Sequence, residues 1–237
     1  MTRRPALLCA AALCVSLAGC AQAVLLGYLI GGPPSIEPDF DSATGLSLSA
    51  PDTVVAVVCY APTKLKWDYE TIDEEVAKTV TYRLGQNHIK VINPDYVRAW
   101  LDEHPDWERA EEVGEAFKCD YVIDMELHAF RLHEENSREL LRGSCEATVN
   151  VVQLSYDKAG EGAAEDATGD KRNGWEFLDG ERIYSKDIQQ IFPTQAPRSA
   201  YDESLESFKA EYLSRLSEAI GWLFYERYSG DKIPWAT

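Results

Sequence analysis

The feature that most constrains the fold is an unbroken run of β-branched and apolar residues, Thr53-Val-Val-Ala-Val-Val-Cys-Tyr60. A strand with one solvated face alternates apolar and polar side chains, and this run does not alternate. Continuous apolar character over such a length is typical of a strand buried on both faces. We therefore expect a central strand in a sheet that is packed with helices.

The residues after this run predict two helices and a short strand between them. Thr71-Ile-Asp-Glu74 is a capping box, and the apolar positions that follow recur at helical spacing until Gly85. His88 to Ile92 is expected to be a short strand. Asn93 then caps a helix whose first position is Pro94 and which ends before Pro105. Asp106 is expected to cap a third helix that runs to Phe117.

Three consecutive strands and a long closing helix complete the predicted fold. The strands are expected at Asp120–Phe130, Leu141–Tyr156 and Glu181–Phe192, the first two pairing as a hairpin. The closing helix begins after the cap Ser199-Ala-Tyr-Asp202 and runs to Gly230 with one apolar stripe. The fold class is α/β (α+β), with topology β-α-β-α-α-β-β-β-α and one mixed five-stranded sheet in the order 2-1-3-4-5.

The amino terminus has the layout of a secretory signal. Arg3 and Arg4 precede an apolar stretch from Ala6 to Ala18, and Leu17-Ala18-Gly19-Cys20 resembles the lipobox of bacterial lipoproteins. The resemblance implies cleavage after Gly19, lipidation of Cys20 and an extracytoplasmic domain held on membrane lipid. Ala21, which is not the retaining aspartate, favours the outer membrane. The alternative is a single transmembrane helix from Ala6 to Ile30, since about 20 apolar residues can cross a bilayer.

These segments divide the chain into a signal peptide (1–19), a tether and flexible linker (20–51), a globular domain (52–230) and a tail (231–237). Within the domain, residues 157–180 are rich in Gly, Ala and acids and are expected to be a flexible insertion. Trp175 and Phe177 lie inside it, where large apolar rings suit a partner-docking anchor. The alternative is that both rings fold back onto their own sheet. Trp67 and Tyr69 allow the same two interpretations.

Charge and cysteine content narrow the partners. The formal net charge is −17, which works against nucleic acid and in favour of basic protein surfaces. Beyond the predicted signal and Cys20, three cysteines remain: Cys59, Cys119 and Cys145. We expect no disulfide among them, because the predicted strands place Cys59 and Cys119 at opposite ends of the sheet. No paired Cys-x-x-Cys zinc spacing is present.

The order of elements resembles the periplasmic lipoprotein domain of the curli-secretion pore protein, the activators of penicillin-binding proteins and the amino-terminal domain of the Tol-system propeller protein. Three stretches carry this resemblance: Val54-Val-Ala-Val-Val, Val91-Ile-Asn and Gly114-Glu-Ala-Phe-Lys-Cys-Asp-Tyr-Val-Ile. In the third, Lys118-Cys119-Asp120 stands where these families have a turn glycine. The layout also resembles uncharacterised lipoproteins of planctomycete bacteria. The resemblance implies architecture and compartment.

Motifs for catalysis, cofactors or metals are weak. Asp124, Glu126 and His128 alternate on one strand face, but side chains two apart emerge about 6.6 Å from each other, so a solvated face is favoured over a metal site. His133-Glu-Glu lacks a second zincin histidine, and P-loop, dinucleotide and Gly-x-Ser-x-Gly motifs are absent. We expect no catalytic residue, metal or cofactor.

The expected function is that of a non-catalytic envelope lipoprotein, an adaptor or regulatory subunit that binds another envelope protein. Two alternatives are a cell-wall-associated hydrolase or its activator, and a structural subunit of an oligomeric envelope assembly. A cleft lined by converging histidines and carboxylates would favour the hydrolase, whereas a flat apolar patch would favour the adaptor.

Overall fold

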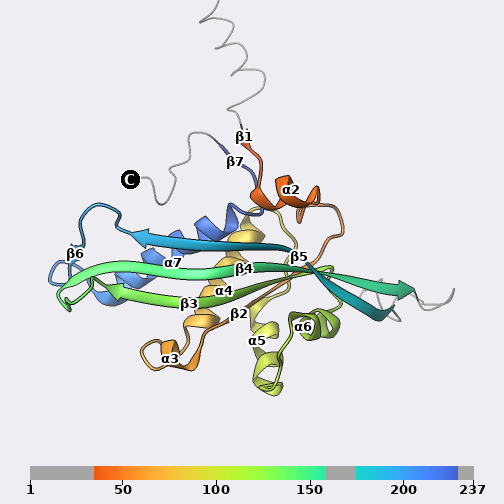
Figure 1. Ribbon diagram of the computed structural model, residues 1–237, viewed down its shortest axis with the longest axis horizontal. Coiled ribbons are helices and arrows are strands. Elements are labelled where there is room, and N and C mark those ends of the chain that lie inside the picture. Colours follow the sequence, from red (N-terminus) through yellow and green to blue (C-terminus); the bar gives the residue numbers. More distant parts are fainter. Residues whose placement is uncertain (1–34, 159–174, 229–237) are drawn as a thin grey trace, which may run out of the picture. The chain divides into compact units, whose positions relative to one another are not determined.

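The computed structural model describes residues 35–158 and 175–228, which fall into two units. The smaller unit contains the antiparallel pair β1 (Ser35–Ile36) and β7 (Arg227–Tyr228). The larger unit, residues 37–225 where described, holds a five-stranded mixed sheet and the helices (Figure 1). The signal peptide, Cys20, most of the predicted insertion and the predicted tail lie outside the described residues.

The sheet has the order β2-β3-β4-β5, with β6 pairing β4 beside the end of β5. β2 (Val55–Tyr60) is parallel to β3 (Tyr121–His133), while β4 (Leu140–Lys158) is antiparallel to both β3 and β5 (Trp175–Phe192). β6 (Arg198–Ser199) is antiparallel to β4. The predicted hairpin and the mixed α/β class are confirmed. The first strand was predicted to be central, but β2 ends the sheet apart from a single bridge on its outer side.

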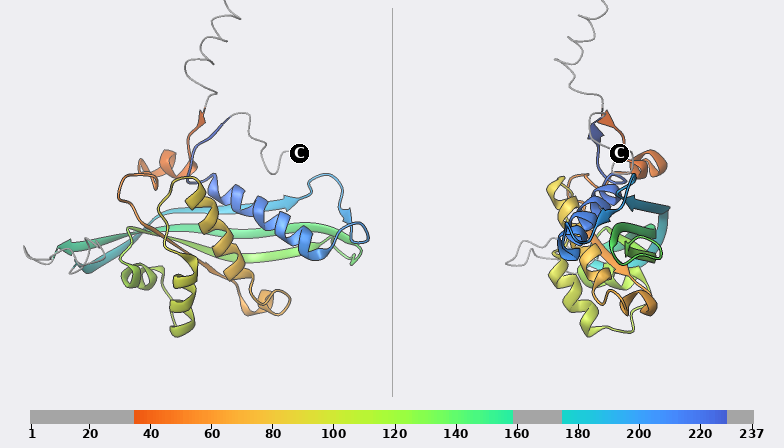
Figure 2. Two further views of the ribbon diagram at one scale, coloured as in Figure 1. Left: turned by 180° about the vertical axis from the view of Figure 1, so that it is seen from behind. Right: turned by 90° about the vertical axis from the view of Figure 1, so that its left-hand side faces the viewer.

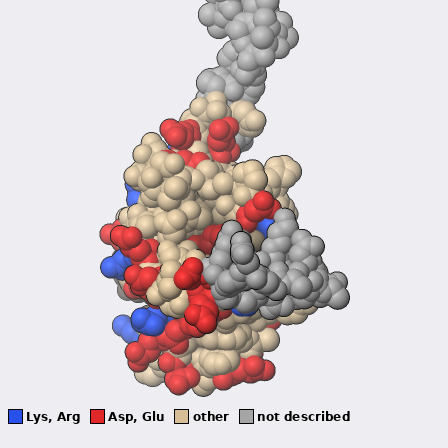
Figure 3. Space-filling view, turned by 90° about the vertical axis from the view of Figure 1, so that its right-hand side faces the viewer, with Lys and Arg blue, Asp and Glu red and all other residues tan. Residues whose placement is uncertain are grey.

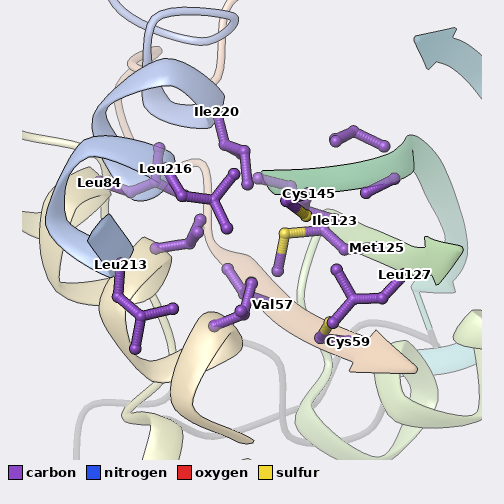
Figure 4. Packing of buried hydrophobic residues seen from close by; sticks show 14 of the residues in the cluster. Val57, Cys59, Leu84, Ile123, Met125, Leu127, Cys145, Leu213, Leu216 and Ile220 are labelled. Carbon is purple, nitrogen blue, oxygen red and sulfur yellow. The ribbon is translucent and has the colours of Figure 1, made fainter. Parts of the chain in front are cut away.

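Helices α4 (Ile72–Gln86) and α7 (Leu205–Gly221) cover one face of the sheet (Figure 2). Their apolar stripes meet the side chains of β2 and β3 that point to this face, and Figure 4 shows Val57, Ile123 and Met125 against Leu216 and Ile220. α5 (Pro94–Glu103) and α6 (Ala110–Phe117) pack on the opposite face around Val58 and Val122. The short helix α3 (Thr63–Lys66) follows β2 directly. β2 therefore contributes to a core on each of its faces, as its unbroken apolar run predicts.

The predicted strand His88–Ile92 is wrong in extent. Only one parallel bridge forms, between Val91 and Val55, on the outer side of β2 where the sequence predicts the second strand. His88 has a left-handed φ of 66°, and α5 begins at Pro94 after its cap, since the Asn93 side chain accepts the Asp95 N–H at 2.9 Å. α5 begins where it was predicted, so the left-handed turn at His88 is what leaves too few extended residues for a strand.

The predicted linker 20–51 is wrong at its carboxyl end. Residues 39–44 form helix α2, which ends at the left-handed Gly45. Phe40 and Leu48 are fully buried, and the Phe40 ring contacts Tyr184, Phe224 and Tyr121. Asp39 accepts a hydrogen bond from the Tyr184 hydroxyl at 2.6 Å, which is the main reason why its pKa lies below the usual value. The compact part of the chain therefore begins well before residue 52.

The predicted insertion is also wrong at both ends, because its flanks are strands. β4 extends to Lys158 and β5 begins at Trp175, so residues 175–180 pair with β4. Two register shifts interrupt this long pairing, leaving Ile183 and Leu178 as extra residues in β5. Such bulges bend and twist a strand pair.

In the described residues no helix is long and apolar enough to cross a membrane.

Candidate functional site

A cleft of about 840 Å³ lies beside the carboxyl-terminal half of β2. Pairing on the outer side of β2 is limited, in the part of the chain that the structure describes, to the bridge at Val55. The residues from Val57 to Tyr60 therefore line a cleft that the first turns of α4 and α5, and the segment between α5 and α6, close from the other sides. Its volume is in the range of small-ligand and peptide side-chain sites.

The cleft is acidic. It is lined by eight acidic and three basic side chains: Asp73, Glu74, Glu75, Asp95, Asp102, Glu108, Asp124 and Glu126, with Lys66, Lys78 and Arg98. Each of the three bases already has an acidic partner in the cleft: Lys66 pairs with Asp73, Lys78 with Asp95 at 3.2 Å, and Arg98 with Glu74 at 2.9 Å. Excess negative charge therefore remains in the cleft.

Asp124, on β3, is the carboxyl group whose ionisation the fold changes most clearly in this cleft. Burial, which is the largest cause, and the nearby Glu126 and Glu111 together raise its pKa to about 6, while Arg182 opposes them. Desolvation and like charges both disfavour the ionised form of a carboxyl group. Asp124 therefore changes its charge close to neutral pH.

Asp73 is the most buried charged residue of the cleft. It is 8% exposed, its Oδ2 pairs with Lys66, and its Oδ1 is fully covered without a hydrogen-bond partner among the described residues. A buried carboxylate oxygen without a donor costs free energy. Tyr60 also lines the cleft, with 53% of its surface exposed.

A polar ladder continues from the cleft across the face of the sheet opposite α4 and α7. It consists of side chains on β3, β4 and β5 that share this face: Asp124, Glu126, His128, Glu146, Thr148, Asn150, Ser185, Asp187 and Gln189. Hydrogen bonds connect the three strands. Asn150 donates to Glu126 at 3.3 Å, Ser185 donates to Asn150 at 2.8 Å, and Thr148 donates to Asp187 at 2.7 Å while it also contacts His128 at 2.7 Å.

Much of the polar ladder is exposed. His128, Glu146, Asp187 and Gln189 are all exposed, in contrast to the part of the same face that α5 and α6 cover. Helices α5 and α6 also carry several acidic side chains. In the side view of Figure 3, red acidic atoms outnumber blue basic atoms on the face shown. The ladder and the cleft thus form one continuous acidic surface.

The sequence placed Asp124, Glu126 and His128 on one strand face, and the structure does so too. His128 hydrogen-bonds to Thr148 on the neighbouring strand. In the described residues, no three His, Cys, Asp or Glu side chains are grouped so that they could hold a metal ion. The ladder is a hydrogen-bonded surface in which each strand orients the polar groups of the next.

The predicted docking residues Trp175 and Phe177 lie at the start of β5. Both are half-buried and contact the Tyr156 ring, with centroids 6.4 Å and 6.1 Å away, and Phe177 packs on the core beneath α6. These contacts match the alternative in which the rings fold back onto the sheet.

Trp67 and Tyr69 differ in which of the two interpretations they match, an exposed docking ring or a ring packed on its own sheet. Trp67 is 80% exposed, whereas Tyr69 stacks edge-on against Phe130.

Cys59, Cys119 and Cys145 are buried, and no disulfide joins them to one another or to other described residues. Cys59 pairs in register with Met125 near the carboxyl end of β2, whereas Cys119 precedes the first residue of β3, so the two lie at opposite ends as predicted. Burial raises the pKa of Cys59 well above its usual value and that of Cys145 to about 12. Cys59 lines the cleft as an un-ionised thiol, which is a poor nucleophile.

Sequence reasoning missed most of the cleft. Local patterns treat Asp73, Asp95 and Arg98 only as helix surface. The first turn of α4 nevertheless holds three acids at 73–75, and that of α5 holds Asp95 shortly after the extended segment at Val91. Ligands in α/β folds commonly bind outside the carboxyl ends of strands where the chain switches sides. Applied to β2 and to the extended segment at residue 91, that rule could have indicated the position of the cleft.

These features define an α/β domain with an acidic cleft and an acidic, hydrogen-bonded sheet face. No family model and no curated protein matches the chain. Similar solved structures include a dodecamer of a PelC point variant from Paraburkholderia phytofirmans (11% identity, 81% of this chain and 96% of that one, TM-score 0.43) and lipoprotein GNA1162 from Neisseria meningitidis (12%, 70% and 99%, 0.35). The hypothetical protein CT253 from Chlamydia trachomatis is another (16%, 73% and 96%, 0.34).

These scores are too low to support a conclusion about function. They also do not single out any of the families that the sequence resembles.

Proposed function

We propose that the protein is a membrane-anchored extracytoplasmic lipoprotein that acts without catalysis, as an adaptor or regulatory subunit that binds another envelope protein. The anchor is the lipidated Cys20 expected from the sequence. The observation that carries the binding role is the exposed polar ladder on β3, β4 and β5. Its side chains are already oriented by hydrogen bonds, so a partner would meet a pre-organised surface at a low entropic cost.

The chemistry of the ladder favours a protein partner with a basic surface. Glu126, Glu146 and Asp187 present carboxylates on neighbouring strands, and Gln189 donates to Glu146 at 3.1 Å. Complementary charges across an interface increase the association rate and exclude wrong partners. The Cys59 thiol that lines the cleft is un-ionised, which gives no support to catalysis by a thiolate nucleophile.

Photo-crosslinking in native membranes tests this function. A photoreactive residue at His128 or at Gln189 should capture the same envelope protein, while the same residue at Glu206, at the start of α7, should capture none. The captured protein, once purified, should bind the full chain, and Asp187→Lys should weaken that binding by reversing a charge in the ladder. Capture from Glu206 alone, or equal binding by Asp187→Lys, would show that the ladder is not the interface.

One observation favours the alternative of a cell-wall hydrolase. Asp124 and Glu126 line the cleft two residues apart, a spacing of about 6.6 Å along a strand, and inverting glycosidases separate their two carboxyls by about 6.5–9.5 Å. A raised pKa such as that of Asp124 suits a general acid. Release of reducing sugars from purified peptidoglycan by the full chain, abolished by Asp124→Asn, would establish this activity in place of the adaptor role.

A further inference from the structure

The acidic cleft combines three features that together point to a cationic occupant. It has a volume of about 840 Å³, it contains more acids than bases, and its bases are already paired with its acids. A hydrogen-bond donor that carries a positive charge would balance the excess of carboxylates in the cleft.

We propose that the cleft receives an arginine or lysine side chain from a segment of the partner protein. Asp124 and Glu126 at the sheet side of the cleft supply carboxylates for a guanidinium or ammonium group. Tyr60, 53% exposed, offers an aromatic face on which such a cation can stack. The inference rests on the proposed binding function, because the cleft continues into the polar ladder through these same two carboxylates.

The electrostatics of Asp124 give this occupant a recognisable pH dependence. Three charged groups face Asp124: Glu126 on its own strand, Glu111 on α6 and Arg182 on β5. The two acids and burial hold its pKa at about 6, so below that pH the carboxyl is neutral and attracts a cation less. A bound cation would favour the ionised form and release a proton. Affinity should therefore increase as the pH rises through about 6.

The test uses the full chain in a neutral detergent and a fluorescein-labelled peptide, Gly-Ser-Gly-Arg-Gly-Ser-Gly, followed by fluorescence anisotropy. A second peptide carries citrulline, the uncharged isostere, in place of arginine. The arginine peptide should bind saturably and at least ~tenfold more tightly than the citrulline peptide, the factor expected for a charge-assisted hydrogen bond. Its affinity should increase from about pH 5 to about pH 7.

Two double variants decide whether the binding belongs to the cleft. Asp124→Asn with Glu126→Gln should lose at least ~tenfold in affinity for the arginine peptide. Asp202→Asn with Glu206→Gln removes the same charge from exposed positions outside the cleft and should leave the affinity unchanged. Circular dichroism of both variants should match that of the parent chain.

The inference is wrong if citrulline binds as tightly as arginine, or if both double variants lose affinity equally. Its failure can be told apart from failure of the adaptor function. Crosslinking from the ladder without arginine binding would retain the adaptor and exclude the cleft as the arginine site. Arginine binding without any crosslinked protein would retain the cationic site and contradict the adaptor.

Discussion

At the scale of single residues, some buried polar atoms lack a hydrogen-bond partner among the described residues. Gln190 is 1% exposed on β5, and neither Nε2 nor Oε1 of its side chain has a hydrogen-bond partner among the described residues. Its backbone carbonyl accepts the Tyr212 hydroxyl at 3.0 Å, which fixes the strand but leaves the amide group unpaired. An unpaired buried amide lowers the stability of the folded state.

Gln190→Met should therefore increase the free energy of unfolding by about 1–2 kcal/mol, because it removes two unsatisfied groups and keeps the volume. Urea denaturation followed by fluorescence measures the change. Gln189→Met is the matched control: Gln189 is the exposed neighbour, and its change should stay within about 0.5 kcal/mol. A loss of stability in Gln190→Met would mean that the amide has a partner such as a buried water.

Asp124 should make stability depend on pH. Its folded-state pKa of about 6 is above the ordinary value of 3.8, so its contribution to stability is fully present below about pH 4 and is lost as the pH rises through about 6. Asp124→Asn should be more stable than the parent by roughly 1–3 kcal/mol at about pH 8, with the difference vanishing near pH 4. Thermal denaturation across this range measures it, and parallel curves for the two proteins would contradict the assignment.

At the scale of elements, α7 packs closely on the backbone of the sheet at Gly143. A Cβ added at Gly143 of β4 would overlap the ring of Tyr212, which is fully buried and held by its hydroxyl. Gly85 of α4 is different, since its Cβ would meet the Val91 Cγ2 at 3.5 Å, an ordinary contact. The two glycines therefore have different reasons to be glycine.

Gly143→Ala should destabilise the domain by about 1–3 kcal/mol, because a tightly packed ring cannot give way to an added methyl group. Gly85→Ala should stabilise it by about 0.5–1 kcal/mol, because alanine is the better residue inside a helix. Chemical denaturation of both variants measures the two changes. Equal effects would show that the contact at Tyr212 relaxes freely.

The elements also show what sequence could and could not predict. The strands β2, β3 and β4 and the helices α4, α5 and α7 follow long apolar patterns, and all were predicted. Helix α2 is held by one aromatic residue, Phe40, which gives no periodicity to detect. The strand predicted at 88–92 does not form because His88 adopts a left-handed turn, which leaves few extended residues before α5. The cleft that results from that missing strand was therefore not predictable from local patterns, whereas the face of Asp124, Glu126 and His128 was.

At the scale of the whole molecule, the membrane anchor is the prediction with the widest consequence. Cys20→Ser should abolish lipidation, because the thiol is the acyl acceptor, and should leave the precursor uncleaved by the lipoprotein signal peptidase. Labelling with radioactive palmitate measures it, with Cys59→Ser as the control that should still be labelled, since Cys59 is buried in the folded domain. Label on Cys20→Ser would contradict the lipobox interpretation.

The two bulges in β5 affect how copies of the protein associate when they are present at a high surface concentration. β5 ends the sheet, and a long regular edge strand is a template onto which other copies can polymerise. The extra residues Ile183 and Leu178 break the edge into short segments of changing twist, and Glu181, Lys186 and Asp187 place charges along it. Chains crowded together on a bilayer would meet edge to edge often. Because the edge is irregular, the β5 strands of two copies cannot pair in one continuous register. The protein should therefore resist fibril formation better than a protein with a long regular edge strand.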